Sequence, residues 1–308
     1  GDKFVVDGIL VTLSTLVRAA REPGKLCVHV FLAGDQVEFV REAVLCSMGE
    51  KAVVHPESHN ALQLHGQGLV LLHEFDPTLV QTTRCVGPET EGTVGMKFDT
   101  GNLDAPNNYV RFHLHELLPE VDRIVYLDSD LVVLGDVAEL LQSMDGSNAT
   151  VAAVPRLNNV LQVYIDVFLP KFPRWVPSES PSFNAGVMVI NLQAWRSRQV
   201  TARIEEWVAE NKKNRIWRHG SQPAMLLVFH DEVHWLDWQW NVDGLGHRLN
   251  YPQEVLQDAK ILHWTGPLKP WLDDGVNRLL WEPHTMRYCP LYSNRHHTTT
   301  CRPDSWFC

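Results

Sequence analysis

The sequence predicts an α/β protein with a Rossmann-like, mostly parallel sheet flanked by helices. Short apolar runs alternate with segments that carry apolar residues at helical spacing, which is the order expected of strands joined by crossover helices. The chain has 308 residues and is 44% hydrophobic, so it can form a large core. All eleven Trp residues lie beyond residue 170, which makes the second half rich in aromatic side chains.

The first half is expected to hold three helices and four strands. Apolar spacing predicts helices over residues 8–21, 36–47 and 106–118. Pro23 and Gly24 would end the first helix, Asp35 and Gly49 would cap and end the second, and Pro106 would open the third. Apolar and β-branched runs predict strands at 26–32, 52–54, 69–73 and 123–127.

A long polar segment interrupts the first half, and the second half continues the alternation. Residues 76–105 are rich in Gly, Thr and Pro and are expected to form a loop, which at that length is usually functional or disordered. Helices are expected near residues 136–142, 192–211 and 223–229, and strands at 150–154, 183–190, 232–236 and 260–264. Residues 155–182 lack a regular pattern and are expected to be irregular.

The charge balance excludes some partners. The chain has 27 Lys and Arg against 37 Asp and Glu, a net charge of −10, which argues against general nucleic-acid binding. An anionic small ligand remains compatible, because a metal or a few local cations can reverse the local field. No run of about 18 apolar residues is present, so contact with a membrane would need a segment absent from this chain. No signal-peptide pattern opens the chain.

The cysteines indicate an oxidising compartment. Three of the six, Cys289, Cys301 and Cys308, lie in a tail with little apolar sequence, which disulfides would hold in place. The others are Cys27, Cys46 and Cys85, and no C-x-x-C spacing suggests zinc. Asn148-Ala149-Thr150 is an acceptor sequon for N-glycosylation. Reduced thiols in a cytosolic protein are the alternative.

Asp128-Ser129-Asp130 follows the apolar run at 123–127. Side chains alternate along an extended chain, so the two carboxylates point to the same side. Together they would offer a hard oxygen site for Mg²⁺ or Mn²⁺ at a strand end, where open α/β sheets bind ligands. Chance alone gives about one such spacing in a chain of this composition, so a solvated turn is the alternative.

A second strand end carries complementary groups. His263 closes the apolar run at 260–264 and is followed by Gly266 and by Lys269, which is flanked by Pro. A metal, a glycine that lets backbone approach a ligand, and a fixed ammonium would together neutralise a diphosphate leaving group. A lone histidine at a strand end is more often a satisfied structural residue, so the combination carries the argument.

These motifs resemble glycosyltransferase family eight. The family pairs an Asp-x-Asp strand end with a later His-x-x-Gly-x-x-Lys-Pro-Trp, and it adds an Asn-Tyr-x-Arg-Phe segment and a Phe-Asn-x-Gly strand. The chain carries all four, at residues 108–112, 126–130, 183–186 and 263–271. The likeness extends from about residue 97 to 283 and is greatest to the eukaryotic Golgi members and the plant galacturonosyltransferase-like branch.

The resemblance implies a GT-A fold and a catalytic domain over residues 1–283. Residues 1–135 would form the nucleotide-sugar half and 136–283 the aromatic-rich acceptor half, with a Cys-rich tail at 284–308. The implied activity is retaining transfer of galactose, glucose, xylose or galacturonic acid from a UDP-sugar to a glycan or glycoprotein acceptor, which forms an α-linkage. The implied cofactor is Mn²⁺, or Mg²⁺ in its place. The implied location is the Golgi or another secretory lumen. The alternative is a catalytically silent relative that binds glycans or serves as a scaffolding subunit.

The resemblance also implies roles for individual residues. Metal ligands would be Asp128, Asp130 and His263. The UDP-sugar would be bound by Arg111, Asp128, Ser129, Gly266 and Lys269. Catalytic roles would fall to Gln222, Asn184 and Lys269. Many relatives have Asp before the glutamine where this chain has Ser221.

A second departure concerns the uracil. In the family, a first strand grips the base and ribose, whereas Gly1–Asp7 reads as the turn after such a strand. How the base is held is therefore open.

Several of these residues also have structural interpretations. Arg111 could form a helix-surface salt bridge, and Asn184 with Gly186 could merely let a strand pack closely. Trp238, Trp240, Trp264 and Trp271 could all be core, although we expect one or two to contact the acceptor, because aromatic rings stack on sugars. Asp237 and Asp243 are expected to be solvated, and Asp243 has the better claim to face the cleft.

Overall fold

The fold is that of a mixed α/β protein. A computed structural model describes residues 5–33, 36–49, 52–56, 58–64, 68–84, 101–166, 176, 178–218, 220–247 and 251–286. Its strands are β1 (Cys27–Ala33), β2 (Ala52–His55), β3 (Ser58–Leu64), β4 (Leu69–Phe75), β5 (Arg123–Leu127), β6 (Leu131–Val133), β7 (Val151–Val160), β8 (Pro181–Asn191), β9 (Val233–Trp235) and β10 (Ile261–His263). Its α-helices are α1 (Val5–Ala19), α2 (Gln36–Met48), α3 (Leu114–Leu117), α4 (Ala138–Ser143), α5 (Leu192–Ser197), α6 (Val200–Asn214), α7 (Gln222–Val228), α8 (Gln253–Gln257) and α9 (Arg278–Trp281).

The described strands form three sheets. Their orders are β1-β4-β3-β2, β10-β6 and β5-β8-β7-β9. The α/β class and the flanking helices agree with the prediction, but the strand pairing is mixed. β1 pairs with β4 and β7 pairs with β9 in parallel, and the other pairs of described strands are antiparallel. The mostly parallel sheet is therefore corrected to a mixed one, because β2–β3 is a hairpin and β8 runs against both neighbours.

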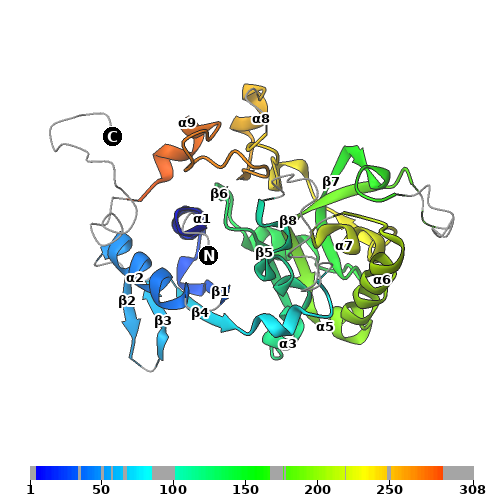
Figure 1. Ribbon diagram of the computed structural model, residues 1–308. Coiled ribbons are helices and arrows are strands. Elements are labelled where there is room, and N and C mark those ends of the chain that lie inside the picture. Colours follow the sequence, from blue (N-terminus) through cyan, green and yellow to red (C-terminus); the bar gives the residue numbers. More distant parts are fainter. Residues whose placement is uncertain are drawn as a thin grey trace.

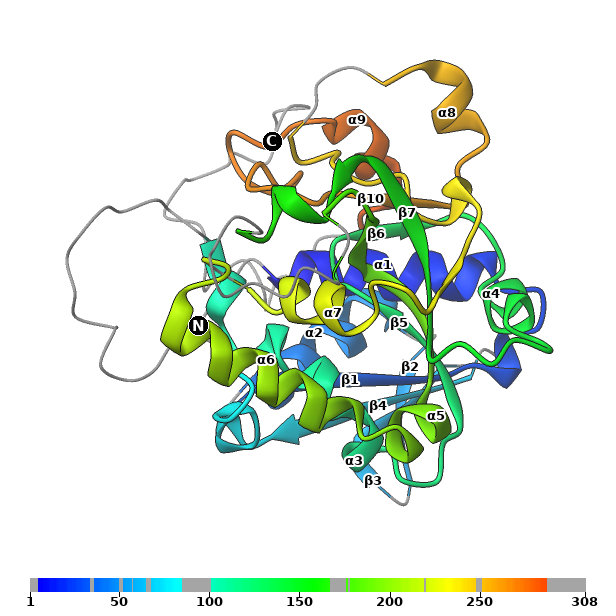
Figure 2. The same cartoon turned by 90° about the vertical axis from the view of Figure 1, so that its right-hand side faces the viewer.

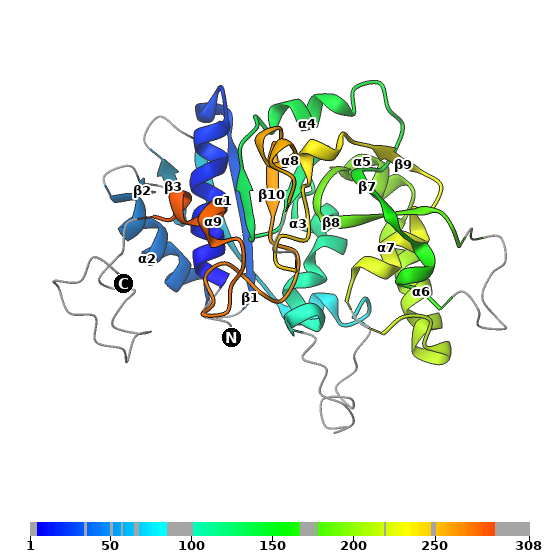
Figure 3. The ribbon, with the colours of Figure 1, turned by 90° about the horizontal axis from the view of Figure 1, so that it is seen from above.

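The sheets lie side by side with helices outside them (Figure 1). β1–β4 occupy one side with α1 and α2, and β5, β7 and β8 occupy the other with α5–α7. Figure 2 shows α6 and α7 on the outer side of this second group. α1 lies between the first sheet, below it in Figure 2, and the β6–β10 pair, above it. Seen from above, α1 runs over the first sheet beside α2 (Figure 3). This arrangement brings the ends of β5, β8 and β10 together.

α1 completes the bonding of β6. Thr12 Oγ1 donates to the Leu131 carbonyl (3.0 Å) and accepts from the Leu131 amide (3.2 Å), and Thr15 Oγ1 accepts from the Val133 amide (3.0 Å). Backbone groups of a buried strand must find partners, and here helix hydroxyls supply them on the side opposite β10. The contact holds α1 against the segment that follows β5.

Most predicted elements are present, with shifted ends. The first helix begins at Val5, so the turn expected over Gly1–Asp7 is helical from that residue. Two strands were missed, β3 and β6, and β7 extends six residues into the region expected to be irregular, since it reaches Val160. Asp35, residues 85–100 of the expected loop, and the tail from 287 lie outside the described residues.

Two predicted helices are broken. The helix expected over 106–118 consists of two short 3₁₀ turns, Pro106–Asn108 and Val110–Phe112, followed by α3. The helix expected over 192–211 is divided into α5 and α6 at Gln199, whose φ is 51°. Arg198 beside it donates to the carbonyl of Asn148 and to the hydroxyl of Thr150, so tertiary bonds override the local helical pattern.

The apolar core lies on both faces of the sheets. One apolar cluster joins β8, α6 and α7, a second joins α1 and α2 to β1–β4, and a third lies under β6 and β10. Trp240 and Trp264 are buried in this core, whereas Trp238 is exposed and Trp271 is partly exposed and contacts Trp281. Among the described residues, no helix is long and apolar enough to cross a bilayer.

Candidate active site

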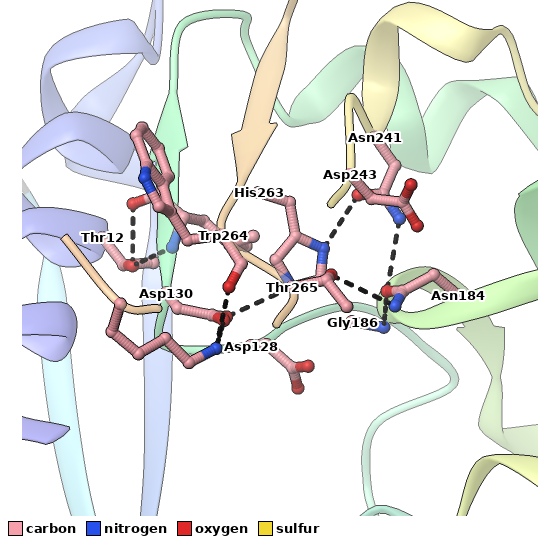
Figure 4. A network of polar contacts seen from close by, with 12 residues as sticks. Thr12, Asp128, Asp130, Asn184, Gly186, Asn241, Asp243, His263, Trp264 and Thr265 are labelled. Atoms are coloured by element: carbon pink, nitrogen blue, oxygen red, sulfur yellow. Dashed lines mark hydrogen bonds and ion pairs between the residues drawn. The ribbon is translucent and has the colours of Figure 1, made fainter. Parts of the chain in front are cut away.

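Two carboxylates and an imidazole converge where β5 ends and β10 ends. Asp128 and Asp130 follow β5, and His263 closes β10, which pairs with β6 in register His263–Leu131. Their ligand atoms all lie within 4.8 Å of one another (Figure 4). The backbone fixes the meeting point, because the Asp128 amide donates to the Gly186 carbonyl (2.8 Å) and the Trp264 amide donates to the Asp130 carbonyl (3.0 Å).

Asp130 is the most enclosed of the acidic groups here. Its carboxylate is 3.2 Å from His263 Nε2 through Oδ1 and 2.5 Å from Lys269 Nζ through Oδ2. Burial by itself would raise the pKa of the Asp130 carboxyl, but Lys269 and His263 outweigh it and hold that pKa well below its usual range. Lys269 also donates to the Trp264 carbonyl (2.8 Å). Asp130 is therefore ionised throughout the physiological range.

Asp128 is held by Arg111 and Tyr126. The Tyr126 hydroxyl donates to Asp128 Oδ1 (3.0 Å), and Arg111 Nη2 donates to the same oxygen (3.3 Å). The Arg111 guanidinium stacks 4.8 Å from the Tyr126 ring centroid and donates to the Ala185 carbonyl (2.9 Å). Burial tends to lower the pKa of Arg111, but Tyr126 and the carboxylates raise it above its ordinary value. The salt bridge anticipated for Arg111 thus exists, and it lies inside the site.

The Phe-Asn-x-Gly strand provides the floor. Asn184 Oδ1 accepts from the Gly186 amide (2.8 Å), and Asn184 Nδ2 donates to Thr265 Oγ1 (3.3 Å). Gln222, the first residue of α7, accepts from the Ala185 amide through Oε1 (3.1 Å). Three predicted residues, Arg111, Asn184 and Gln222, therefore meet around the backbone of residues 184–186.

The remaining predicted residues are placed by close backbone contacts. Gly266 has a φ of 127° and packs on Gly246 so tightly that a Cβ would come within 3.0 Å of the Gly246 backbone. Ser129 is partly buried, and its carbonyl lies against Gly8 of α1. These glycines allow chain segments to approach to a distance that no side chain permits. Both are consistent with a site walled by main chain.

The residues present fit a divalent metal. Two carboxylates and a neutral imidazole are a donor set suited to Mn²⁺ or Mg²⁺, with the imidazole favouring the former. Gly186 leaves the space for them: a Cβ there would come within 3.0 Å of His263 Cε1, Asp128 Oδ2 and Asn184 Oδ1. Asp128, Asp130 and His263 could therefore hold the ion, with Lys269 as the adjacent cation.

Outside this cluster, one prediction for an aspartate was wrong and the other was correct. Asp243 is partly buried and forms an ion pair with Arg156, so the expectation that it is solvated was wrong. Asp237 is exposed, as expected. Trp240 lies under Lys260 and is structural, which leaves Trp238 and Trp271 as the candidates for stacking on a sugar.

Sequence reasoning missed three groups. Tyr126 shares a strand face with Asp128, so the period-two rule that paired Asp128 with Asp130 could have found it. Asn241 accepts a hydrogen bond from His263, but 22 residues separate the two and no local pattern connects them. Thr265 Oγ1, 3.1 Å from His263 Nε2, lay within the quoted motif and was not singled out.

Comparison with known proteins gives the same family as the motifs. The profile described as "Glycosyl transferase family 8" matches residues 5–275. "Probable galacturonosyltransferase-like 3" of Arabidopsis thaliana is 38% identical over 241 residues, which are 72% of this chain and 65% of that protein. "Probable galacturonosyltransferase-like 4" of the same plant is 32% identical over 74% of this chain and 64% of its own length. The chain thus spans less than two thirds of these relatives.

Solved structures show the fold. The galactosyltransferase LgtC in complex with donor and acceptor sugar analogues superposes with a TM-score of 0.61 at 19% identity, covering 92% of this chain and 93% of that one. Mouse xyloside xylosyltransferase 1 gives 0.53 at 20% identity over 84% and 91%. The fold is therefore the GT-A fold of glycosyltransferases. Since the family profile covers most of the sequence and the four motifs meet in one site, the chain belongs to glycosyl transferase family 8.

Proposed function

We propose that this chain is a metal-dependent, retaining glycosyltransferase that moves a sugar from a UDP-sugar to a glycan or glycoprotein acceptor and forms an α-linkage. The observation that carries the proposal is the cluster of Asp128, Asp130 and His263 with Lys269 beside it. A silent relative would not need an ionised carboxylate buried between an imidazole and an ammonium, because burying charge is costly.

The diphosphate leaving group would bind on the side of the site that carries Asp128 and Lys269. Mn²⁺, when bound, supplies positive charge that stabilises the departing diphosphate. Lys269, whose side chain is 28% exposed, would contribute a second charge to the same oxygens. The main chain at Ser129 and Gly266 would border the nucleotide. Arg111 would keep Asp128 oriented and would bind donor hydroxyls or phosphate.

The sugar side would be Asn184 and Gln222. A covalent route needs a carboxylate near the anomeric carbon, whereas the segment against Ala185 offers Ser221 and Gln222, a hydroxyl and an amide. We therefore infer front-face substitution. The bond from the anomeric carbon to the diphosphate oxygen breaks, the acceptor oxygen forms its bond on the same face, and the acceptor's proton passes to the departing oxygen. Gln222 would stabilise positive charge on the sugar through its carbonyl dipole.

The donor and the compartment follow from the relatives and the sequence. Among galactose, glucose, xylose and galacturonic acid, the names of the similar plant proteins favour galacturonic acid. The sequon at Asn148 and the cysteine-rich tail, whose disulfides remain a prediction, favour a Golgi or other secretory lumen. The division into a nucleotide-sugar half (1–135) and an acceptor half (136–283) is retained as part of the proposal.

A donor screen tests the proposal. Purified protein is incubated with UDP-galacturonic acid, UDP-galactose, UDP-glucose or UDP-xylose, with Mn²⁺ and a pool of glycan acceptors, and both UDP release and labelled product are measured. We expect one donor to dominate and NMR coupling of the product to show an α-linkage. A β-linked product would refute retention, and a trapped glycosyl-enzyme would refute the front-face route. Glycan binding with no transfer from any donor would identify the silent relative instead.

A further inference from the structure

The side chain of Asn241 bridges the two halves of the site. Asn241 Oδ1 is 2.9 Å from His263 Nδ1, and Asn241 Nδ2 is 3.5 Å from Asn184 Oδ1 (Figure 4). Both Asn241 and His263 are buried, with 6% and 1% of their surfaces exposed. We infer that Asn241 is a positioning residue, which fixes the ring and tautomer of His263 for the metal and joins that ligand to the strand carrying Asn184; this rests on the proposed function.

The directions of these hydrogen bonds follow from one backbone amide. The Gly186 N–H can only donate, so the Asn184 atom 2.8 Å from it is the amide oxygen. That oxygen requires a donor from Asn241, so the Asn241 NH₂ faces Asn184 and its oxygen faces His263. An amide oxygen can only accept, so Nδ1 of His263 carries a hydrogen. Nε2, which lies 3.2 Å from Asp130 Oδ1, is therefore the ring nitrogen that faces the metal position.

The backbone holds Asn241 beside its partner. The Val242 amide donates to the Ile261 carbonyl (3.0 Å), and the His263 amide donates to the Val242 carbonyl (3.0 Å). Val242 and Leu262 form a parallel bridge, so residues 241–242 run along the edge of β10. The side chain of Asn241 is thus delivered to the Nδ1 side of the ring by main-chain bonds. Because Asn241 is already fixed, it restricts rotation of the His263 ring before a metal binds, and no further ordering is needed on binding.

An amide suits this position better than the carboxylate often found behind a metal-bound histidine. The site already contains Asp128 and Asp130, and a third buried charge would face Asn184 Oδ1, which cannot turn away because the Gly186 amide holds it. The neutral Asn241 satisfies an N–H on one side and an oxygen on the other. It therefore links the metal ligand His263 to Asn184 on the sugar side of the site without adding charge.

The experiment measures Mn²⁺ affinity directly, by EPR of free Mn²⁺ in titrations of the folded protein. Asn241→Leu has a similar shape and removes both bonds, and we expect the Mn²⁺ dissociation constant to rise about 10- to 100-fold, the usual effect of losing a partner behind a ligand. Asn241→Asp keeps the acceptor for Nδ1, so its affinity should stay at the wild-type value or tighten, while its donor KM rises because an oxygen now opposes Asn184.

Asn211→Leu is the matched control. Asn211 is an equally buried asparagine on α6 that accepts from the Trp217 amide (2.8 Å), a bond that involves no residue of the metal cluster. Its replacement should lower the melting temperature and leave Mn²⁺ affinity unchanged. Melting curves of all three variants separate loss of fold from loss of positioning.

The outcomes distinguish the positioning role of Asn241 from the proposed function. An unchanged Mn²⁺ dissociation constant in Asn241→Leu, with sugar transfer in the wild type, would overturn the inference alone. Mn²⁺ binding that depends on Asn241, without transfer by the wild type, would support the positioning role and reject the proposed function. A wild-type protein that binds no Mn²⁺ would overturn both.

Discussion

Gly186 lies directly against the imidazole of His263. A Cβ at residue 186 would come closer than 3.0 Å to His263 Cε1, a separation that real Cβ atoms essentially never show. The glycine in the Phe-Asn-x-Gly strand is therefore required by the residues around the metal position and not by its own backbone conformation. The structural alternative for Gly186 was that it lets the strand pack closely. That close packing is against His263 and Asp128, so it also serves the function of the site.

Gly186→Ala should disable the site while the strand remains in place. The added methyl would push His263 and Asp128 apart, and both Mn²⁺ affinity and turnover should fall, turnover by at least about 100-fold given the several kcal/mol a metal contributes. EPR titration and an initial-rate assay measure the two effects. Gly146→Asn is the control, since Gly146 lies in open space with a φ of 76° that Asn tolerates. Wild-type metal affinity in Gly186→Ala would contradict the geometry.

Lys269 and Gln222 should give different kinetic signatures. Lys269→Ala removes charge from the leaving group, so the donor KM should rise and turnover should drop together, roughly 100-fold or more. Gln222→Ala removes a dipole beneath the sugar and should lower turnover without abolishing it. Steady-state kinetics on a single donor compare the variants. A Gln222→Ala enzyme as inactive as a metal-ligand variant would indicate a covalent role for that segment.

A histidine pair makes the fold sensitive to acid. His29 Nδ1 is 2.9 Å from His73 Nε2 across β1 and β4, and the two rings stack 5.0 Å apart. Burial lowers the pKa of both, and His73 lowers that of His29 further. The folded protein then binds fewer protons than the unfolded chain near pH 6.5, so stability is fully present above about pH 7 and declines as pH falls through about 6.5.

Replacing His73 should reduce that decline. Melting temperatures from pH 8 to 5.5 should fall less steeply in His73→Phe, which keeps an aromatic ring against Phe31. The control is His59→Gln, because the His59 side chain is 68% exposed. Equal slopes in His73→Phe and the wild type would show that the pair does not couple folding to pH.

Asn148 should carry an N-linked glycan when the protein passes through a secretory pathway. Asn148 is exposed in the loop before β7, whereas Thr150 is buried and accepts from Arg198 (2.9 Å). A shallow cavity of about 360 Å³ beside it is lined by polar groups, including Arg198, Glu232 and His234. Digestion with an N-glycanase should increase gel mobility for the wild type and Thr150→Ser but not for Asn148→Gln. A secreted wild type without glycan would remove this support for a lumenal location.

The strands that the sequence predicted well are continuous apolar runs next to polar motif residues. β8 is buried along most of its length and β5 is partly buried throughout, and the bounds of both matched closely. β3 begins with three exposed residues, so only its second half shows a buried pattern, and β6 has three residues. The mixed strand directions were not predictable from the order of helices and strands, because either direction is compatible with that order.

The site was predictable where its residues are close in sequence. Asp128 and Asp130 follow from the alternation of a strand, and the remaining assignments came from motifs at residues 108–112, 183–186 and 263–271 and, for Gln222, from the place of the Ser221-Gln222 segment in the family resemblance. Asn241 and the Asp243–Arg156 pair arise from tertiary contacts between segments separated by 22 and 87 residues, which no local pattern encodes. Gly186 was noticed as a close-packing residue, but its contact with His263 requires the β5–β8 and β6–β10 pairings together.

The most direct test of the account is sugar transfer by wild type, Asp128→Ala and Asp130→Ala, each assayed with Mn²⁺ and with EDTA. The account predicts transfer by the wild type with Mn²⁺ alone, and loss of transfer and of Mn²⁺ affinity in both variants, which should remain folded because the residues lie at a strand end. Asp237→Ala, at an exposed aspartate, should behave as the wild type. Full activity of either variant, or wild-type activity that survives EDTA, would contradict the metal-dependent mechanism.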